Sequence, residues 1–99
     1  MSFKPFDLSG RVALITGGNG GIGLGMARGL AAAGAEVCLW GTNPDKNARA
    51  REALLDYGPK ITAQVCDVSN EQAVGDAFAQ MLKDHGRVDG CFANAGVGG

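Results

Sequence analysis

Apolar runs and segments with helical spacing alternate along this chain. The apolar runs cover residues 11–16, 36–40, 60–66 and 88–93. Between them, apolar residues recur as on one face of a helix over residues 21–33, from 44 to about 58–59, and from 69 to 86. The pattern predicts strands and helices in the order β-α-β-α-β-α-β.

The ends of the helical segments carry signals of their own. Asn43 before Pro44 is typical of an N-cap followed by proline at the first helical position. Ser69 with Gln72 has the spacing of a capping box at the start of the third helix. Gly86 follows the last apolar position of that helix and predicts its end.

Two of the helices show which face packs against a sheet. In the first helix, an apolar stripe is formed by Ile22, Met26, Leu30 and Ala33. Three small residues of the same helix permit a close approach to the sheet: Gly23, Ala27 and Ala31. In the third helix, the residues expected to face inward are Val74, Ala77, Phe78, Met81 and Leu82.

Helices that join consecutive strands require right-handed crossovers, so we expect a parallel sheet with helices on both faces. This is a doubly wound α/β fold of the Rossmann type, in which the strands, numbered along the chain, have the order 3-2-1-4. A ligand crevice is expected beside the loops that follow strands one and four, where the strand order reverses. The fourth strand would form the edge of an incomplete sheet.

The loop from Thr16 to Gly23 is rich in glycine. Strand, glycine loop and helix in succession are typical of a diphosphate site, because bare backbone permits close approach and the helix N-terminus favours negative charge. Gly17 suits the tight turn, Gly21 the close approach and Gly23 the helix packing. The alternative is a glycine-rich turn without a ligand. A triphosphate-binding loop is not expected, since no lysine follows Gly23 until Lys46.

Composition and charge narrow the functions further. A chain with 45% hydrophobic and 19% charged residues is an ordinary globular protein. The net charge of −1 provides no basic surface for nucleic acid. No apolar run approaches the roughly 18 residues of a membrane span, and residues 1–7 lack the apolar core of a secretion signal. We expect a cytoplasmic protein that binds neither nucleic acid nor membranes.

The cysteines and the single histidine are expected to have structural roles. Cys38, Cys66 and Cys91 form no C-x-x-C pair, so we expect reduced, buried thiols that pack as small apolar residues. His85 lies in the last turn of the third helix, where a partly cationic ring suits the helix dipole. We expect it at the surface.

Four ordered motifs resemble those of the short-chain dehydrogenase/reductase family, and together they span the chain. They are T-G-x-x-x-G-x-G at residues 16–23, Asp-Val at 67–68, Gly-Arg-Val-Asp at 86–89 and Asn-Ala-Gly at 94–96. The resemblance implies a nicotinamide dinucleotide, NAD or NADP, as cofactor. The cofactor-binding residues that it implies are Gly17, Asn19, Gly20, Gly21, Ile22, Gly23, Thr42, Asn43, Asp67, Val68, Asn94, Ala95 and Gly96.

The resemblance implies that Asp67 and Val68 bind the adenine ring. The Asp67 carboxylate would accept from the exocyclic amine, and the following backbone amide would meet a ring nitrogen. The alternative for Asp67 is an acidic residue at a helix start, ahead of Ser69. Residues 94–96 would touch the adenosine ribose and brace the sheet. Trp40, at the end of the second strand, either walls the adenine pocket or packs in the core or at its rim.

The choice between NAD and NADP has weak determinants. Members that bind NAD hold the ribose 2′-hydroxyl with an acid after the second strand, and Gly41 occupies that position. Members that prefer NADP often carry arginine at the next position, which here is Thr42. Thr42 and Asn43 are suited to a ribose hydroxyl or, less strongly, to a phosphate. Arg49 and Arg51 lie further along a helix and are expected to face solvent. This pattern slightly favours NAD.

The catalytic groups of the family are not expected in this chain. In the family, a serine and a Tyr-x-x-x-Lys pair follow the Asn-Ala-Gly motif. The single tyrosine, Tyr57, is followed by Gly58, Pro59 and Lys60, which is one residue short of that spacing. Gly-Pro would also break the helix that aligns the pair.

The chain thus resembles the N-terminal, cofactor-binding half of a short-chain dehydrogenase, with residues 1–99 as part of one dinucleotide-binding domain. It is either a fragment of a longer reading frame, which we favour, or a natural truncation. The resemblance implies a homo-oligomeric parent that interconverts an alcohol and a ketone or aldehyde. The alternative is a non-catalytic nucleotide-binding or interaction module.

Overall fold

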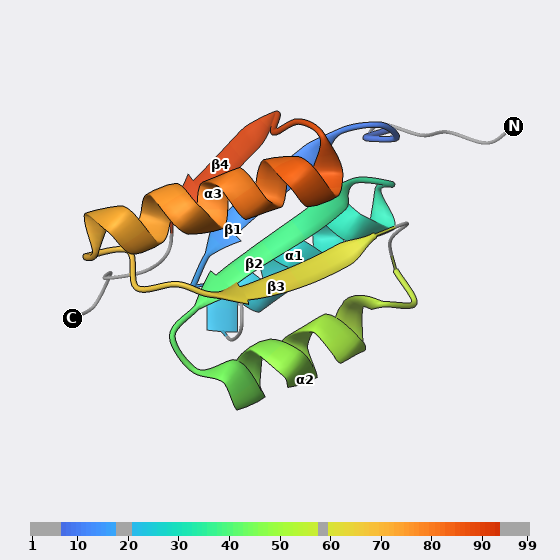
Figure 1. The fold of residues 1–99 in the computed structure, drawn as a ribbon. Helices are drawn as coiled ribbons and strands as arrows, with labels where there is room; N and C mark the ends of the chain where they lie inside the picture. Colours follow the sequence, from blue (N-terminus) through green and yellow to red (C-terminus); the bar gives the residue numbers. More distant parts are fainter. Residues whose placement is uncertain (1–6, 18–20, 58–59, 94–99) are drawn as a thin grey trace, which may run out of the picture.

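A computed structural model of the chain describes residues 7–17, 21–57 and 60–93 (Figure 1). The elements are β1 (Val12–Thr16), α1 (Gly21–Ala32), β2 (Glu36–Gly41), α2 (Pro44–Leu54), β3 (Ile61–Val65), α3 (Glu71–His85) and β4 (Gly90–Ala93). All neighbouring strands are parallel and their order is β3-β2-β1-β4. The predicted element order and the Rossmann-type sheet are confirmed.

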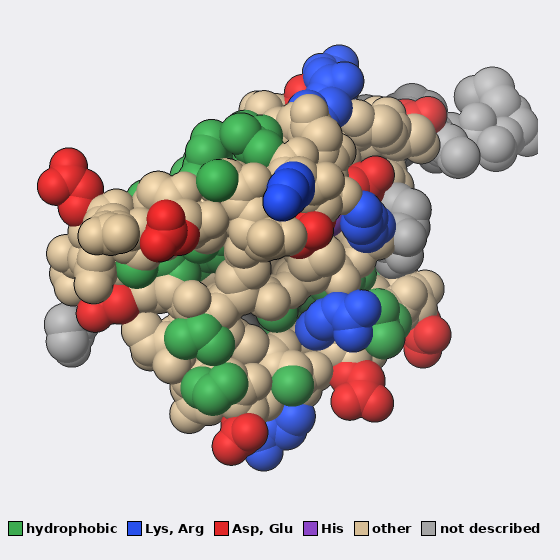
Figure 2. Space-filling view, in the orientation of Figure 1, with side chains coloured by type: hydrophobic (Ala, Val, Ile, Leu, Met, Phe, Trp, Pro, Cys, Tyr) green, Lys and Arg blue, Asp and Glu red, His purple; other side chains and the backbone are tan. Residues whose placement is uncertain are grey.

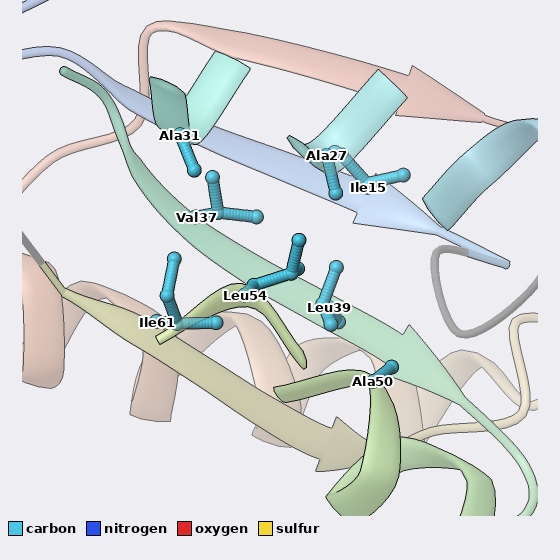
Figure 3. Close-up of a cluster of buried hydrophobic side chains, with 8 residues drawn as sticks. All are labelled: Ile15, Ala27, Ala31, Val37, Leu39, Ala50, Leu54 and Ile61. Carbon is cyan, nitrogen blue, oxygen red and sulfur yellow. The ribbon is translucent and has the colours of Figure 1, made fainter. Parts of the chain in front are cut away.

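The sheet is covered on both faces, by α1 and α2 on one side and by α3 on the other (Figure 1). Alternate residues of each strand therefore enter two separate cores. The core under α1 and α2 contains Ile15, Ala27, Ala31, Val37, Leu39, Ala50, Leu54 and Ile61 (Figure 3). The core under α3 contains Val12, Leu14, Cys38, Trp40, Cys66, Ala77 and Met81.

Helix α1 approaches the sheet through its small residues. Gly23, Ala27 and Ala31 are its buried positions, and Figure 3 shows the two alanines directed toward the strands. The predicted apolar stripe is wrong at its first residue, because Ile22 is 81% exposed. A line of small side chains brings the helix axis close to the sheet, so Ile22 in the first turn is left beyond the covered part of the sheet.

The predicted capping box at the start of α3 is wrong. Asn70 is the N-cap, and its side-chain oxygen accepts from the Ala73 amide at 3.0 Å. The Ser69 hydroxyl instead donates to Asp67 at 2.7 Å, which leaves it one residue ahead of the cap. Asparagine and serine are comparable N-caps, so the turn that precedes the helix decided between them. Gly86 ends α3 in the left-handed conformation, with φ 83°, as predicted.

The prediction of a surface position for His85 is also wrong. Its side chain is buried, and Nε2 and Nδ1 lie 2.7 Å from the Thr62 hydroxyl and from a Glu36 carboxylate oxygen. The ring therefore links the end of α3 to the amino ends of β2 and β3. Trp40 packs in the core under α3, and its indole N–H donates to the Gln64 side chain at 2.7 Å.

Several element ends differ from the predicted ones. Helix α2 ends at Leu54, followed by a turn in which the Tyr57 amide donates to Leu54 O at 2.9 Å. Strand β4 begins at Gly90 because Asp89 contacts β1 through side chain as well as backbone. Its carboxylate accepts from the Val12 amide at 2.9 Å and from Arg87 at 2.6 Å. The hydrogen bond from Arg87 lowers the pKa of Asp89 most, and the hydrogen bond from the Val12 amide lowers it further.

Two of the three cysteines are buried as expected. Burial raises the pKa of the Cys38 thiol to about 11 and raises that of Cys66 as well, so both remain neutral thiols. The prediction is wrong for Cys91, which is a free and exposed thiol on β4. Phe78 and Leu82 on α3 are also exposed, rather than buried as predicted. Helix α3 therefore covers β4 only in part, which leaves Cys91 exposed.

Strand β4 is an open margin of the sheet. A hollow of about 360 Å³ lies on its α1 side, beside Leu30 and Phe92. A second hollow of about 310 Å³ lies on its α3 side, beside Phe78, Val88 and Cys91. Figure 2 shows hydrophobic side chains gathered where β4 and α3 lie in Figure 1. An apolar edge strand of this kind is a template for self-association.

We therefore expect residues 1–99, produced alone, to self-associate rather than behave as a well-folded monomer. Size-exclusion chromatography with light scattering should give masses above the 10.1 kDa of one chain. Phe92→Lys should shift the population toward monomer, because a charged side chain opposes edge pairing. Leu55→Lys, at an exposed apolar residue after α2, should leave the association unchanged. A monodisperse wild-type monomer with a sharp cooperative melt would contradict this expectation.

Candidate functional site

The carboxyl ends of the four strands lie together at one rim of the sheet, where the arrowheads meet in Figure 1. Parallel strands impose this arrangement, and ligands of open α/β sheets bind outside such a rim. The structure brings three predicted stretches to it. They are Gly17 with residues 21–23 after β1, Thr42 and Asn43 after β2, and Asp67 and Val68 after β3. The other predicted residues, Asn19, Gly20, Asn94, Ala95 and Gly96, lie outside the described part of the chain.

The glycines at the start of α1 have the backbone that the loop motif requires. Gly17 has φ 70°, and its amide donates to Trp40 O at 2.8 Å, which joins the loop to β2. Gly21 has φ 57°, and a Cβ built on it meets no described atom within 4 Å. Gly23 is buried on the sheet-facing side of α1. The first turn of α1 carries no acidic residue, so its N-terminus is electrostatically suited to an anion.

Asn43, after β2, serves as the N-cap of α2. Its side-chain oxygen accepts from the amides of Asp45 at 2.9 Å and Lys46 at 3.1 Å, as the Asn-Pro pair predicted. Within residues 7–17, 21–57 and 60–93, no hydrogen bond involves the Thr42 hydroxyl. Of these two predicted residues, Thr42 therefore has the hydroxyl that is available to a ligand.

The carboxylate of Asp67 is anchored on one side. Its Oδ1 accepts from the Ser69 hydroxyl at 2.7 Å and from the Ser69 amide at 2.9 Å. The bond from the hydroxyl lowers the pKa of Asp67 most, and the bond from the amide lowers it further. The carboxylate therefore stays ionised to a lower pH than usual. Among the described residues, none forms a hydrogen bond or ion pair with Oδ2. The turn supports the helix-start role of Asp67 and also leaves one oxygen for a ligand.

Exposed apolar side chains gather at the same rim. Ile22 is 81% exposed, Val65 60% and Val68 43%, although apolar side chains of this size are usually buried in a protein this compact. Val65 was missed by the sequence analysis. The signal that would have found it is a β-branched residue at the last position of a strand, where the chain leaves the sheet.

Asn47 was missed as well. It is 3% exposed, and its side-chain amide donates to Gly41 O at 3.0 Å and to Gln64 O at 3.1 Å. Ala50 and Leu54 are the other buried residues of α2. A polar residue in the apolar phase of an amphipathic helix was the signal in the sequence.

Other kinds of site are absent from the part of the chain that the structure describes. There, no three His, Cys, Asp or Glu side chains cluster as metal ligands would. Among the same residues, no helix is long and apolar enough to cross a membrane. Tyr57 lies beyond the C-terminal end of α2, at the opposite end of the sheet from the glycine loop, with the Arg28 guanidinium 5.9 Å from its ring centroid.

Comparisons with known proteins agree with this geometry. The sequence model of the family described as short chain dehydrogenase matches residues 11–99. Sorbose reductase SOU1 of Candida albicans is 39% identical over 92 residues, which are 93% of this chain and 33% of that protein. A probable NADP-dependent mannitol dehydrogenase of Yarrowia lipolytica is 37% identical over 94 residues, 95% of this chain and 34% of that protein.

A solved structure extends the comparison to the fold. The crystal structure of NAD+-bound xylitol dehydrogenase matches 93% of this chain with a TM-score of 0.89 and 35% identity, and the match covers 35% of that protein. The chain therefore spans about a third of the length of the relatives it matches. Because the family's sequence model covers nearly all of it, the chain belongs to the short-chain dehydrogenase family.

Proposed function

We propose that this chain is the cofactor-binding portion of an NAD(P)-dependent oxidoreductase that interconverts an alcohol and a ketone or aldehyde by hydride transfer. The observation that carries the proposal is the convergence of three motif stretches on one rim of the sheet. The glycine loop after β1, the turn after β2 and the Asp67 turn after β3 succeed one another along it. That succession matches the diphosphate, ribose and adenine of a dinucleotide.

Each part of the ligand has a chemically matched partner. The diphosphate would lie against Gly21 and the N-terminus of α1, where a Cβ on Gly21 would meet none of the described atoms. The adenosine ribose would meet Thr42. The adenine amino group would donate a hydrogen bond to Asp67 Oδ2. The adenine ring would cover the exposed side chains of Val65 and Val68.

We favour NAD over NADP for this site. A 2′-phosphate needs a cation or free amides, and Asn43 already occupies the amides of Asp45 and Lys46. The Arg51 guanidinium donates to Ile61 O at 2.8 Å, at the amino end of β3 and away from the rim. Asp45 adds negative charge in the first turn of α2. The similar proteins include both an NAD+-bound enzyme and one named as NADP-dependent, so the preference depends on these residues.

The chemical step belongs to the rest of the proposed parent protein. Hydride transfer to a carbonyl must be accompanied by a proton, which a positioned acid supplies. Tyr57 is far from the rim, so we propose that the serine and the tyrosine–lysine pair come from a segment outside this chain. The parent is proposed to be a cytoplasmic homo-oligomer. Its relatives are named for sorbose, mannitol and xylitol, which makes polyols and their ketoses the first substrates to assay.

In the complete polypeptide that contains this chain, Gly21→Asp should abolish dinucleotide binding, because a carboxylate would crowd and repel the diphosphate. The fold should tolerate it, since the Cβ meets no described atom and the left-handed backbone costs a non-glycine residue only about 1–2 kcal/mol. Gly25→Asp adds the same charge one turn further along α1, at a position that is also open, and should retain binding. Fluorescence titration with NADH measures both variants. Unchanged affinity in Gly21→Asp would remove the loop from the site.

Asp67→Ala should weaken NADH binding by about 10- to 150-fold, the range for losing one hydrogen bond to an ionised group. Ser69→Ala is the matched control, because it removes the hydroxyl contact to Oδ1, keeps the backbone amide contact and leaves Oδ2 available at the rim. Titration with NADH and a thermal melt should be recorded for both. If both variants melt earlier and neither changes affinity, the helix-start role alone explains Asp67.

The complete polypeptide that contains this chain should oxidise a polyol or reduce its ketose, followed by nicotinamide absorbance, whereas residues 1–99 alone should show no turnover. Turnover by the isolated chain would mean that one of its own residues moves the proton. A complete polypeptide that binds the dinucleotide and turns over no alcohol or carbonyl would instead support the non-catalytic nucleotide-binding module.

A further inference from the structure

Asn47 contacts two strands at once. Its side-chain amide donates to Gly41 O at 3.0 Å and to Gln64 O at 3.1 Å, at the carboxyl ends of β2 and β3. Among the described residues, Asn47 and Thr16 are buried polar residues, and the His85 side chain is buried as well. Burying an amide is unfavourable unless its hydrogen bonds are made, and here both carbonyls lie where the rim begins.

These bonds fix the turn that leaves β2. Gly41 O also accepts from the Cys66 backbone amide at 3.1 Å. The backbone amide of Asn47 donates to Asn43 O at 3.0 Å. Asn43 in turn caps α2 with its side chain. The backbone on both sides of Thr42 is thereby held to α2 and β3. The Thr42 side chain itself has no hydrogen-bond partner in the described part of the chain.

An apolar residue at this position would satisfy the packing of α2. Ala50 and Leu54, three and seven positions further on, are buried on the same side of the helix. Leucine branches at Cγ as asparagine does, and its larger, apolar side chain would continue this face. The side-chain amide of Asn47 therefore serves to hydrogen-bond Gly41 O and Gln64 O. These two carbonyls lie where β2 and β3 reach the rim.

We propose that Asn47 is a positioning residue: by holding Gly41 O and Gln64 O, it sets the turn so that the Thr42 hydroxyl meets the 2′-hydroxyl of the adenosine ribose. This inference rests on the proposed function, since it requires a dinucleotide at the rim. It adds a residue that does not contact the ligand and acts through Thr42.

The test is Asn47→Leu in the complete polypeptide, with NADH and its 2′-deoxyadenosine analogue as probes. The variant should bind NADH about fivefold more weakly, the usual effect of one lost hydrogen bond between neutral groups. Its loss with the 2′-deoxy analogue should stay within about twofold, because the contact that Asn47 positions is already missing there. At saturating cofactor, kcat should change little while the KM for NADH rises.

Two control variants separate positioning from general stability. Leu54→Ala removes a fully buried side chain of the same helix and should lower Tm without changing either affinity. Thr42→Val removes the exposed hydroxyl itself and should reproduce the selective loss with NADH, whether or not Asn47→Leu folds.

Three results would overturn the inference alone. They are an Asn47→Leu variant that melts earlier with unchanged NADH affinity, an equal loss for NADH and the 2′-deoxy analogue, and a Thr42→Val variant that binds NADH as the wild type does. A wild-type polypeptide that binds no dinucleotide would overturn the proposed function, and this inference with it.

Discussion

The close approach of α1 to β1 and β2 is the contact on which the candidate site depends. Ala27 and Ala31 are completely buried against Ile15, Val37 and Leu39. Small side chains bring the helix near the sheet, and its first turn then lies directly beyond the end of β1. A larger residue at either alanine would overpack this contact, at a cost of about 1–3 kcal/mol. It would also move the helix N-terminus away from the loop that it supports.

The remaining helices are fixed to the sheet by polar contacts at opposite ends. At the amino end, His85 joins α3 to Glu36 and Thr62. At the carboxyl end, Asn47 joins α2 to the ends of β2 and β3. Hydrophobic burial alone permits a helix to slide along a sheet, whereas a buried hydrogen bond is strong only in one geometry. The ends of β2 and β3 at the rim therefore have a defined geometry before any ligand binds.

The two edges of the sheet differ in how completely they are covered. On the β3 side, α2 covers Ile61 and buries it completely. On the β4 side, hollows remain on both faces, and Cys91 and Phe92 are exposed. The exposed apolar surface at β4 marks where further structure would be most stabilising. The exposed apolar residues at the rim, Ile22 and Val65, mark instead the expected position of a ligand.

The sequence by itself determined what depends on neighbouring residues along the chain. The element order, the left-handed glycines at Gly17 and Gly86 and the Asn43 cap follow from local spacing and backbone geometry. The strand order follows from the doubly wound topology that the element order indicates. Only the tertiary structure decided what depends on coverage by a distant element. His85 is buried because β2 and β3 place Glu36 and Thr62 beneath it, a pairing between residues far apart in the sequence. Periodicity identifies the face of a helix but not how far the sheet extends under it, which is why Ile22 and Phe78 are exposed.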